Sequence, residues 1–571
     1  MEGSLDPQRR HRPTFAELFT PKLVTILREG YTLQDFRADA IAGLTVAIVA
    51  LPLSMAIAIA AGVPPERGLY TAIIGGFLVS ALGGSRFQIG GPAGAFIVLV
   101  ASIVERQGYD GLVLATLVAG LILIVVGFLR LGTYIKYIPF PVTVGFTAGI
   151  AVIIFASQLK ELLGLTLATE PAAFIPKVAA IAGALGTVNL SAGAVGGVTF
   201  LMILGIRRWR PDWPALLIAV TAAAAIAATL AIDVATISSR FGELPRSLPA
   251  PALPPFSFAK LVAILPDAAT IALLGAIESL LSAVVADGMS GRRHRSNCEL
   301  VAQGSANIAS VVFGGIPVTG TIARTATNVR AGAKSPVSGI LHAGYLLLFM
   351  LLLAPLAGYI PLAALGAVLA VVAWNMAERR DFFVLLGASA GDRVVLMATF
   401  LLTVFVDLAT AIGVGVVLAS FIFLHRMAES IEVGRQRLVP EDQADDVGER
   451  TAYDPAADRD VMVYRISGAF FFGATAAVSG IFDRIGQPPR ILVLDFSDVP
   501  IVDSTAARSL ENFAERLRKS GTLIFIAGAA PPVRHSLIRA GLGKPLARYA
   551  KSVSQAIEFG RARLAANEAP Q

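Results

Sequence analysis

The sequence predicts an all-α polytopic membrane protein with about fourteen membrane-spanning helices, followed by a C-terminal α/β domain. Three observations lead to this fold class. Long apolar runs fill most of the chain as far as about residue 426, and basic residues gather in alternate loops between those runs. After about residue 460, short apolar strands alternate with helical segments.

The composition excludes an ordinary soluble protein. Of the 571 residues, 55% are hydrophobic and only 15% are charged, whereas soluble domains carry about 25% charged residues. The net charge is +7, but the basic residues stand in short clusters between apolar runs rather than on one soluble module. The composition therefore indicates a chain folded in a lipid bilayer, and it argues against nucleic acid as a partner.

The segment 1–38 is polar and basic, and it contains no apolar stretch of the kind found in a cleavable signal peptide. We expect it to be a cytoplasmic N-terminal segment. Because Cys298 is the single cysteine, no internal disulfide is expected.

A transmembrane domain is predicted over residues 39–426. Its first apolar run follows Asp39 and lasts until Glu66, which is long enough for a helix to cross a hydrocarbon core of about 30 Å. Further apolar runs lie near 68–83, 92–104, 111–129, 138–159, 188–206, 214–232, 264–286, 299–313, 317–329, 338–357, 361–376, 393–408 and 409–425.

The loops indicate the orientation of these helices, because loops on the cytoplasmic side of a membrane are enriched in lysine and arginine. If the N-terminus is cytoplasmic, every second loop lies on the same side, and those loops are the basic ones. They contain Arg86; Arg130 and Lys136; Arg207, Arg208 and Arg210; Arg292, Arg293 and Arg295; Arg330 and Lys334; and Arg379, Arg380 and Arg393. We therefore expect a multi-pass inner-membrane (plasma-membrane) protein with both termini in the cytoplasm.

The character of the chain changes after the last apolar run. Residues 427–460 are polar and acidic, and we interpret them as a linker. Strands are expected at "VMVYRIS" (461–467), "RILVLDFS" (490–497) and "TLIFIAGA" (522–529), and an amphipathic helix at 504–521. This alternation predicts an α/β domain over 461–565.

Two short apolar segments differ from the other spans. They are "FQIGGPAGAFIVLVA" (87–101) and "VFGGIPVTGTIARTATNV" (312–329), and each has a glycine pair and a proline before a short apolar helix. They occupy corresponding places in the two halves of the membrane domain. Such paired segments are typical of inverted-repeat transporters, in which half-helix N-termini face a central cavity and bind an anion through backbone N–H groups. The alternative is two ordinary helices with glycine or proline kinks.

Polar side chains near these segments are the candidates for the site. Gln88 precedes the first half-helix, Thr321 lines the start of the second, and Arg324 lies within it. Arg324 either supplies positive charge beside the site or lies at the inner mouth. Glu278 lies deep in the run 264–286, where a carboxylate costs several kcal/mol unless it is paired or protonated. It is therefore either a coupling group or half of a structural ion pair.

These residues resemble the sulfate permease (SulP) family, the bacterial relatives of prestin and of the animal sulfate, chloride and bicarbonate exchangers. The resemblance covers about 38–560 and rests on "AGLTVAIVALPLSMAIAIAAGVPPERGLYTAIIGG", "GGSRFQIGGPAGAF", "GAIESLLSAVVADGMSGRRHRSNCELVAQGSANI" and "FGGIPVTGTIARTATNVRAGAKSP". The last two stretches look most like the bacterial four-carbon dicarboxylate transporter of that family. The family fold so implied is a 7+7 inverted repeat divided into core and gate domains.

By this resemblance, the substrate lies between the third and tenth helices and against the first. The implied substrate-binding residues are Leu51, Pro52, Ala93, Gly94, Ala323 and Arg324, beside the candidates Gln88 and Thr321. Glu278 matches the acidic position of the eighth helix, and we expect it to couple an ion together with Ser282. The sodium–bicarbonate members carry an Asp with hydroxyl neighbours there, so Glu followed by Ser279 and Ser282 favours protons over sodium.

The C-terminal domain resembles a STAS domain, because "VLDFSDVPIVDSTAARSL" (493–510) fits its signature. In anti-sigma-factor antagonists with this signature, the Ser after the Asp is the phosphoacceptor, which implies Ser504 as a regulatory residue here. Ala506 stands where Gly is usual, and the alternative is that Ser504 is an unphosphorylated helix cap. The resemblance also implies a homodimer.

We therefore predict a secondary active transporter of small anions, with proton-coupled uptake of four-carbon dicarboxylates such as succinate and fumarate as the first choice. The alternatives are a bicarbonate or sulfate transporter, coupled to protons or to sodium, and a channel or sensor that signals through the STAS domain. The sequence offers no metal-ligand cluster and no nucleophile–base set, so we expect neither an enzyme nor a cofactor.

Overall fold

The computed structural model describes residues 14–568, except for 168–169, 212, 256, 430–431, 436–459 and 472–488. The chain divides into two compact units, one that ends at Val416 and one that begins at Val417. The first unit is helical, and the second contains a sheet covered by helices.

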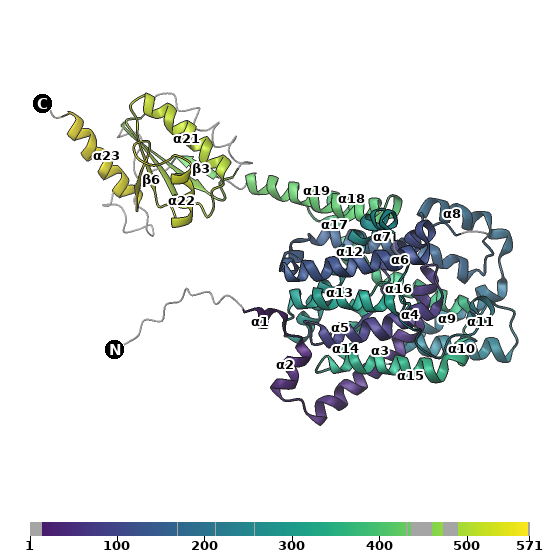
Figure 1. Ribbon diagram of the computed structural model, residues 1–571. Helices are drawn as coiled ribbons and strands as arrows, with labels where there is room; N and C mark the ends of the chain where they lie inside the picture. Colours follow the sequence, from purple (N-terminus) through teal and green to yellow (C-terminus); the bar gives the residue numbers. More distant parts are fainter. Residues whose placement is uncertain are drawn as a thin grey trace. The chain divides into compact units, whose positions relative to one another are not determined.

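The first unit is built almost entirely of helices (Figure 1). Within the described residues, eight helices are long and apolar enough to cross a membrane. Each apolar run predicted from the sequence overlaps one or more helical elements, and several of these elements are shorter than a full span. The helices are α1 (Phe15–Phe19), α2 (Lys22–Glu29), α3 (Leu33–Ala60), α4 (Pro65–Tyr70), α5 (Gly76–Leu82), α6 (Phe96–Phe128), α7 (Phe140–Leu162), α8 (Phe174–Gly183), α9 (Leu190–Trp209), α10 (Ala215–Thr229), α11 (Ile237–Phe241), α12 (Phe258–Ser290), α13 (Ser296–Val312), α14 (Ile322–Arg330), α15 (Val337–Ala357), α16 (Leu362–Met376), α17 (Arg379–Gly387) and α18 (Ala390–Phe405). A π-helix η1 (Thr71–Gly75), the 3-10 helices η2 (Leu131–Tyr137) and η3 (Leu185–Thr187), and α19 (Leu408–Glu429), which crosses the unit boundary, complete the set.

Two helix boundaries differ from the expectation. α3 begins at Leu33 rather than after Asp39, because Thr32 and Asp35 form a capping box that starts the helix earlier. The runs 92–104 and 111–129 lie on one element, α6, which is broken at Gly108, where φ is 69° and ψ is 179°. Glycine adopts this positive φ without strain, so the helix is broken at a single residue and no loop intervenes between the two runs.

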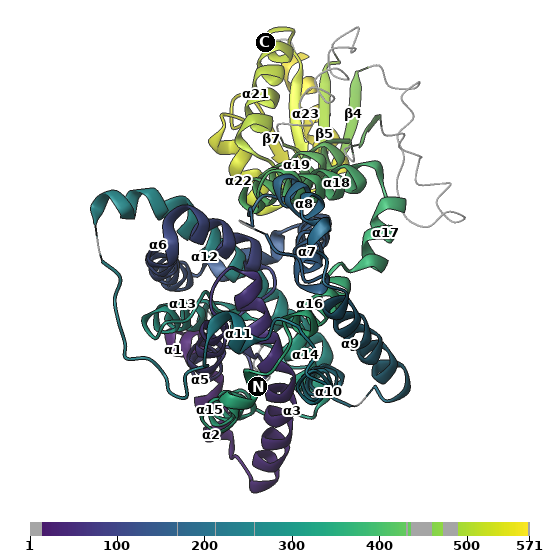
Figure 2. The ribbon, with the colours of Figure 1, turned by 90° about the vertical axis from the view of Figure 1, so that its right-hand side faces the viewer.

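The membrane helices pack in two sets. The first helix set consists of α3–α6 and α12–α15, and the second helix set of α7, α9, α10 and α16–α18. Packing is dense within each set, whereas contact between the sets is made chiefly by α3, which lies against α16 and α10. Figure 2 shows the two sets beside each other. This division agrees with the expected core and gate domains.

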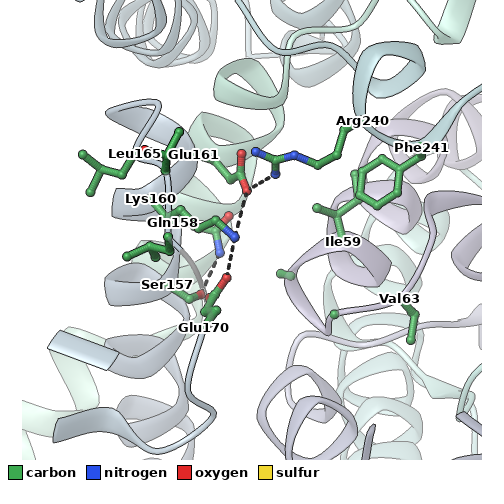
Figure 3. A pocket seen from close by; sticks show the side chains of 14 residues that line it. Ile59, Val63, Ser157, Gln158, Lys160, Glu161, Leu165, Glu170, Arg240 and Phe241 are labelled. Carbon is green, nitrogen blue, oxygen red and sulfur yellow. Dashed lines mark hydrogen bonds and ion pairs between the residues drawn. The ribbon is translucent and has the colours of Figure 1, made fainter. Parts of the chain in front are cut away.

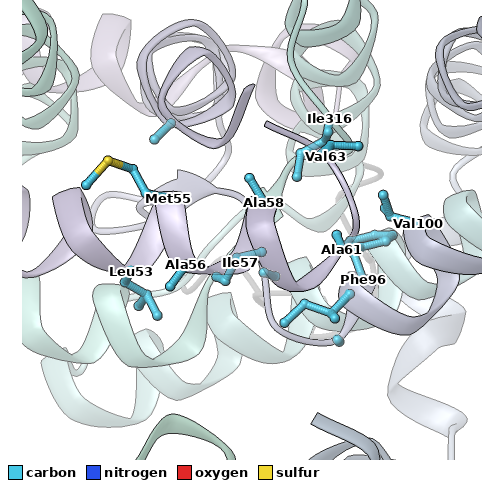
Figure 4. Packing of buried hydrophobic residues seen from close by; sticks show 14 of the residues in the cluster. Leu53, Met55, Ala56, Ile57, Ala58, Ala61, Val63, Phe96, Val100 and Ile316 are labelled. Atoms are coloured by element: carbon cyan, nitrogen blue, oxygen red, sulfur yellow. The ribbon is translucent and has the colours of Figure 1, made fainter. Parts of the chain in front are cut away.

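Small residues let the helices of the first set approach one another closely. α6 and α13 cross at Gly120 and Gly304, where a Cβ on Gly120 would lie 2.7 Å from the carbonyl oxygen of Gly304. Because neither glycine carries a side chain, the two backbones meet directly. The middle of α3 is also buried in the first helix set. Its residues Leu53 and Met55 lie in an apolar core that contains Phe96 of α6 (Figure 4).

The second unit contains a five-stranded sheet in the order β3-β4-β5-β6-β7, in which β3 is antiparallel to β4 and the other neighbours are parallel. Apolar side chains of α21 and α22 pack on one face of the sheet, and those of α23 on the other. The three predicted strands and the predicted helix are found close to their expected positions. The elements are β3 (Glu432–Arg435), β4 (Val461–Ser467), β5 (Ile491–Asp498), α21 (Ser504–Lys519), β6 (Leu523–Ala527), α22 (Pro531–Arg539), β7 (Arg548–Ala550) and α23 (Val553–Glu568).

The strand β3 was not expected from the sequence. It falls in the segment interpreted as a linker, and it pairs along β4 from Glu432 opposite Ser467 to Arg435 opposite Tyr464. A four-residue strand that contains two charged residues and a glycine carries too weak a pattern to be recognised. Most of the expected linker lies outside the described residues.

Candidate functional site

The two interrupted segments meet inside the first unit. β1 (Gly90–Gly91) precedes α6 and pairs antiparallel with β2 (Thr319–Gly320), which precedes α14. Gly90 lies opposite Gly320, and the backbone N–H of Thr321 donates to the Ile89 carbonyl over 3.0 Å. Both segments are therefore extended before their helices begin. We call the paired strands β1 and β2 the strand crossing. This arrangement agrees with the half-helix interpretation and not with two ordinary kinked helices.

Buried hydroxyl groups hold the strand crossing together. Ser279 Oγ of α12 lies 2.7 Å from Thr319 Oγ1, and Ser282 donates to Thr325 Oγ1 over 3.0 Å. Thr325 also accepts a hydrogen bond of 3.1 Å from the backbone N–H of Ile89. Ser282, predicted as a coupling residue, is thus one of the buried hydroxyl residues that support the strand crossing. The sequence gives no sign of the role of Thr325, because a threonine in a membrane helix usually bonds to its own helix.

Two half-helices start beside the strand crossing. α6 begins at Phe96 and α14 at Ile322, and in neither does the N-cap side chain bond a first-turn N–H. In α6, the N–H groups of Phe96 and Ile97 bond back to the carbonyls of Ala93 and Gly94. In α14, the first such bond runs from the N–H of Thr325 to the Thr321 carbonyl over 2.9 Å. Among the described residues, the N–H groups of Ile322, Ala323 and Arg324 have no backbone partner, so they and the positive end of the dipole are open to an anion.

The predicted small residues lie at these helix starts. Ala93 is buried, and Gly94 is partly buried. A Cβ on Gly94 would lie 3.2 Å from Met376 Sδ at the end of α16, which brings the start of α6 against the second helix set. Ala323 is exposed on the first turn of α14. A larger side chain at either position would therefore occupy space at the half-helix ends.

Arg324 extends from α14 into the first helix set and is 2% exposed. Its Nη2 donates to Ser54 Oγ of α3 over 3.1 Å and to the Pro92 carbonyl over 3.4 Å. Within the described residues, it has no carboxylate ion-pair partner, and its Nε and Nη1 have no hydrogen-bond partner. Arg324 thus lies at the strand crossing and not at an exposed mouth. A buried, unbalanced guanidinium requires an anion to offset its desolvation.

Two glycines of the crossing make room for polar side chains. A Cβ on Gly91 would collide with Nη1 of Arg324, and a Cβ on Gly320 would collide with the carboxamide of Gln88. Gln88 is buried, and its Nε2 and Oε1 have no partner among the described residues. Free donors of Arg324 and Gln88 therefore lie against the same pair of strands. Such donors bind an anion through charge-assisted hydrogen bonds.

The first helix contributes differently from the expectation. Pro52 is buried within α3, and Leu51 lines a small pocket together with Met55 and Phe349 of α15. The contact from α3 to Arg324 is made by Ser54. The sequence does not single out this serine, because most membrane-helix serines bond back to their own helix.

Glu278 lies on α12, one residue before Ser279, whose hydroxyl group contacts Thr319 of the strand crossing. Its Oε2 is buried and has no hydrogen-bond partner among the described residues. No ion pair includes Glu278 in that part of the chain, so the structural ion pair considered as an alternative is not observed. A carboxyl group in this position is free to hold or release a proton.

A cavity of about 460 Å³ lies between the C-terminal ends of α3 and α7 (Figure 3). Its charged side chains are paired: Arg240 lies 2.6 Å from Glu161, and Lys160 lies 2.9 Å from Glu170. Since α3 belongs to the first helix set and α7 to the second, the cavity separates the two sets at this end. Because its charges are balanced, it lacks the unpaired cation found at Arg324.

Ser504 belongs to the second unit, where it is the first residue of α21 and is exposed. The helix cap is Asp503, whose Oδ1 accepts a hydrogen bond of 2.8 Å from the N–H of Ala506. The alternative that Ser504 is the helix cap is therefore wrong. Its side chain stands in solvent at a helix N-terminus, a position that favours negative charge.

Comparisons with known proteins follow the same division of the chain. Residues 36–399 match the sulfate permease family, and residues 453–556 match the STAS domain. The chain is 40% identical to the putative sulfate transporter YvdB of Bacillus subtilis, over 90% of this chain and 95% of that protein. It is 32% identical to the bicarbonate transporter BicA of Synechocystis, over 88% of this chain and 90% of that protein.

Solved structures share the fold. The murine solute carrier 26 family member A9 anion transporter in the inward-facing state aligns with a TM-score of 0.84, over 98% of this chain and 97% of that chain, at 19% identity. The transmembrane domain of a cyanobacterium bicarbonate transporter, BicA, aligns with a TM-score of 0.61 at 30% identity, over 68% of this chain and 98% of that chain. The first likeness concerns the fold alone.

Proposed function

The chain belongs to the sulfate permease family of anion transporters, and from this premise we propose a secondary active transporter that takes up four-carbon dicarboxylates, such as succinate and fumarate, together with protons. It is a multi-pass membrane protein and not an enzyme. In the proposed cycle, the anion reaches the strand crossing from one side of the membrane and leaves it toward the other.

The observation that carries the proposal is the buried guanidinium of Arg324, which has two free donor nitrogens and no carboxylate partner among the described residues. A charge in this state is costly unless an anion balances it. The open first turn of α14 lies on the same segment, so side-chain charge and helix dipole act on the same region. The bound species is therefore a small anion that can approach the backbone N–H groups at the first turn of α14 and accept hydrogen bonds from them.

A dicarboxylate fits donors that are spread over the strand crossing. One carboxylate binds the free nitrogens of Arg324, and the other faces the free carboxamide of Gln88. The likeness of residues 275–308 and 313–336 to the dicarboxylate member of the family supports this choice. The second candidate is a bicarbonate or sulfate transporter, which is favoured by the names of the relatives BicA and YvdB.

Coupling to protons is proposed from the environment of Glu278. Its carboxyl group has no cation partner, while the neighbouring hydroxyls of Ser279 and Ser282 are hydrogen-bonded to Thr319 and Thr325. A sodium ion would need several oxygen ligands arranged around the carboxylate, whereas the hydroxyl groups of Ser279 and Ser282 are directed to Thr319 and Thr325. A proton needs only the carboxylate itself, so we assign Glu278 as the proton carrier.

Alternating access follows from the two helix sets. The start of α6 faces α16 at Gly94 and Met376, so the site lies where the first set meets the second. Sliding of one set past the other exposes the half-helix ends first to one side and then to the other. We place the protein in the bacterial inner membrane as a homodimer with both termini in the cytoplasm.

We propose that the C-terminal domain regulates transport through Ser504. A phosphate at this exposed helix N-terminus adds negative charge where the helix dipole favours it. The uptake rates of Ser504→Glu and Ser504→Ala test this role, because a regulatory phosphorylation requires the two variants to differ.

The function is tested by uptake into proteoliposomes that contain the purified full chain. Radiolabelled fumarate, succinate, sulfate and bicarbonate are each offered with a pH gradient, with a sodium gradient and with neither. Saturable, pH-driven uptake of fumarate and succinate is expected. Sodium-driven bicarbonate uptake, or sulfate uptake alone, would replace the dicarboxylate by the second candidate. Unsaturable flux would indicate a channel, and the absence of any flux would favour a sensor.

A further inference from the structure

Helix α13 carries a row of buried polar side chains that none of the roles above uses. Glu299, Gln303 and Asn307 follow one another at intervals of four residues, so they share one face of the helix. Their exposed fractions are 0%, 0% and 1%. Nε2 of Gln303 donates to Oε1 of Glu299 over 3.0 Å, and Nδ2 of Asn307 donates to the Gln303 carbonyl over 2.8 Å. Because buried polar groups are costly without hydrogen bonds, the other partners of this row show what it holds.

Glu299 holds the turn that leads into β1. Its Oε2 accepts hydrogen bonds from the backbone N–H groups of Gly84 and Ser85, over 2.8 and 3.1 Å. The turn is also bound to the chain just before α13, since the N–H of Arg295 donates to the Gly84 carbonyl over 3.0 Å. A Cβ on Gly84 would collide with the Arg295 carbonyl, so the two backbones are in contact. From this turn the chain runs directly through Gln88 into β1.

Asn307 holds the chain before the other strand. Its Oδ1 accepts from the N–H of Val318 over 3.0 Å, and its Nδ2 donates to the Val318 carbonyl over 2.8 Å. These are the two hydrogen bonds that a residue of a neighbouring strand would exchange with Val318, which directly precedes β2. One rigid helix therefore fixes the segments before β1 and before β2.

The surroundings of Glu299 differ from those of Glu278. Oε2 of Glu278 has no hydrogen-bond partner among the described residues, whereas both carboxylate oxygens of Glu299 accept hydrogen bonds. An acid whose oxygens are all engaged with N–H donors fixes the groups that carry those donors. Glu299 is therefore placed to hold the turn rather than to meet the anion.

We propose that Glu299 is a positioning residue for the anion site, which fixes the Gly84–Ser85 turn and, through this turn, the carboxamide of Gln88. The inference rests on the proposed anion site, in which Gln88 supplies free donors beside those of Arg324. The space for the carboxamide is narrow, because a Cβ on Gly320 would collide with it. A shift of the turn moves Gln88 away from this place and changes the spacing of the donors that the two ends of a dicarboxylate meet.

The experiment measures the binding of fumarate and of sulfate to the purified full chain, with the melting temperature as a separate measure of stability. Glu299→Ala removes the acceptor of the turn and should lower affinity about tenfold. Glu299→Gln keeps an oxygen that accepts from both N–H groups, so its affinity should stay within about threefold of the native value. If Glu299→Ala does not fold, Glu299→Asp takes its place, because the shorter side chain withdraws the oxygen from the turn.

A double-mutant cycle tests the route from Glu299 to the anion. If Glu299 acts through Gln88, Glu299→Ala should have little further effect in a Gln88→Ala background. Asp39→Ala is the matched control, because Asp39 is also buried and its Oδ1 accepts from the consecutive N–H groups of Lys334 and Ser335. That turn joins α14 to α15 and does not lead into the strand crossing. The control should lower the melting temperature and leave the affinity unchanged.

The outcomes separate this inference from the function on which it rests. If the native chain binds sulfate alone, the dicarboxylate assignment fails, and the same variants test Glu299 with sulfate. If it binds neither probe, the anion site fails and the inference with it. With a probe bound, the positioning role is overturned by any of four results: native affinity in Glu299→Ala, no rescue in Glu299→Gln, additive losses in the cycle, or an equal loss in Asp39→Ala.

Discussion

Nη2 of Arg324 lies 3.1 Å from the hydroxyl oxygen of Ser54, although 270 residues separate the two in the sequence. This hydrogen bond connects α14 with α3 and holds the guanidinium at the Pro92 carbonyl, just before α6 begins. The first, third and tenth membrane segments therefore meet at one side chain.

Removal of the Arg324 charge should weaken anion binding more than it slows turnover. A charge-assisted hydrogen bond contributes about 1.5–3 kcal/mol, so Arg324→Ala should lower affinity by roughly 10- to 100-fold. Arg324→Lys keeps the charge and should lose less. Binding of labelled fumarate to purified protein measures the effect, with Arg330→Ala as the control, since Arg330 is exposed at the end of the same helix. Equal affinity of Arg324→Ala and the native chain would remove Arg324 from the site.

Gly91→Ala should weaken anion binding although the charge of Arg324 is kept. A Cβ at Gly91 would occupy the place of the Arg324 Nη1 atom, so the guanidinium must move away from its position. The expected result is a loss of affinity comparable to that of Arg324→Lys, with little further loss when both changes are combined. A helical glycine with open space around it, Gly205, provides the matched Gly→Ala control. Full additivity of the two changes would contradict a shared mechanism.

Ala323→Leu should block the site by bulk. Ala323 is exposed on the first turn of α14, and a leucine there covers the backbone N–H groups that the anion must approach. Binding should fall below detection while the protein remains folded, as judged by its elution in size-exclusion chromatography. Ala225→Leu, at an exposed position of α10, serves as the control. Normal transport by Ala323→Leu would mean that the site lies elsewhere.

Glu278→Gln should uncouple accumulation from the pH gradient. The amide cannot carry a proton, and it replaces a carboxyl group whose Oε2 has no partner among the described residues, so the fold should tolerate the change. Proteoliposomes with the variant should exchange labelled anion across the membrane but not concentrate it when a pH gradient is applied. Glu243→Gln, an exposed position, is the control. Undiminished pH-driven accumulation would end the coupling role of Glu278.

Removal of the second unit should leave the anion site intact. The strand crossing and its supporting helices all lie in the unit that ends at Val416. A chain truncated after Glu429 should insert and bind fumarate, with an altered transport rate or a lower melting temperature. Calorimetric titration of the truncated chain measures the affinity. A well-folded truncated chain that no longer binds would show that the C-terminal domain takes part in the site.

The sequence predicts the helices and the half-helices well, because their signals are local. Apolar runs mark each membrane helix, and the glycine pairs followed by proline mark the segments that become β1 and β2. The strands of the second unit are likewise visible as short apolar runs, whereas β3 is too short and too polar to be noticed.

The contacts of the site could not be predicted in the same way. Ser54 and Thr325 look like ordinary residues of membrane helices, and only the folded chain brings Ser54 to Arg324 or Thr325 to the Ile89 N–H. A single sequence contains no measure of such distant pairing. The family resemblance implies Leu51 and Pro52 of the first helix, whereas the contact to Arg324 comes from Ser54.

The antiparallel pairing of β1 with β2 has a consequence for the order in which the protein assembles. The backbone N–H of Ile89 is hydrogen-bonded to a threonine that is 236 residues further along the chain. During synthesis, the first half of the membrane domain therefore enters the bilayer before the backbone polar groups of its extended segment have their hydrogen-bond partners. Completion of the anion site is a late step of biogenesis, and an isolated first half would expose that edge to lipid or to other chains.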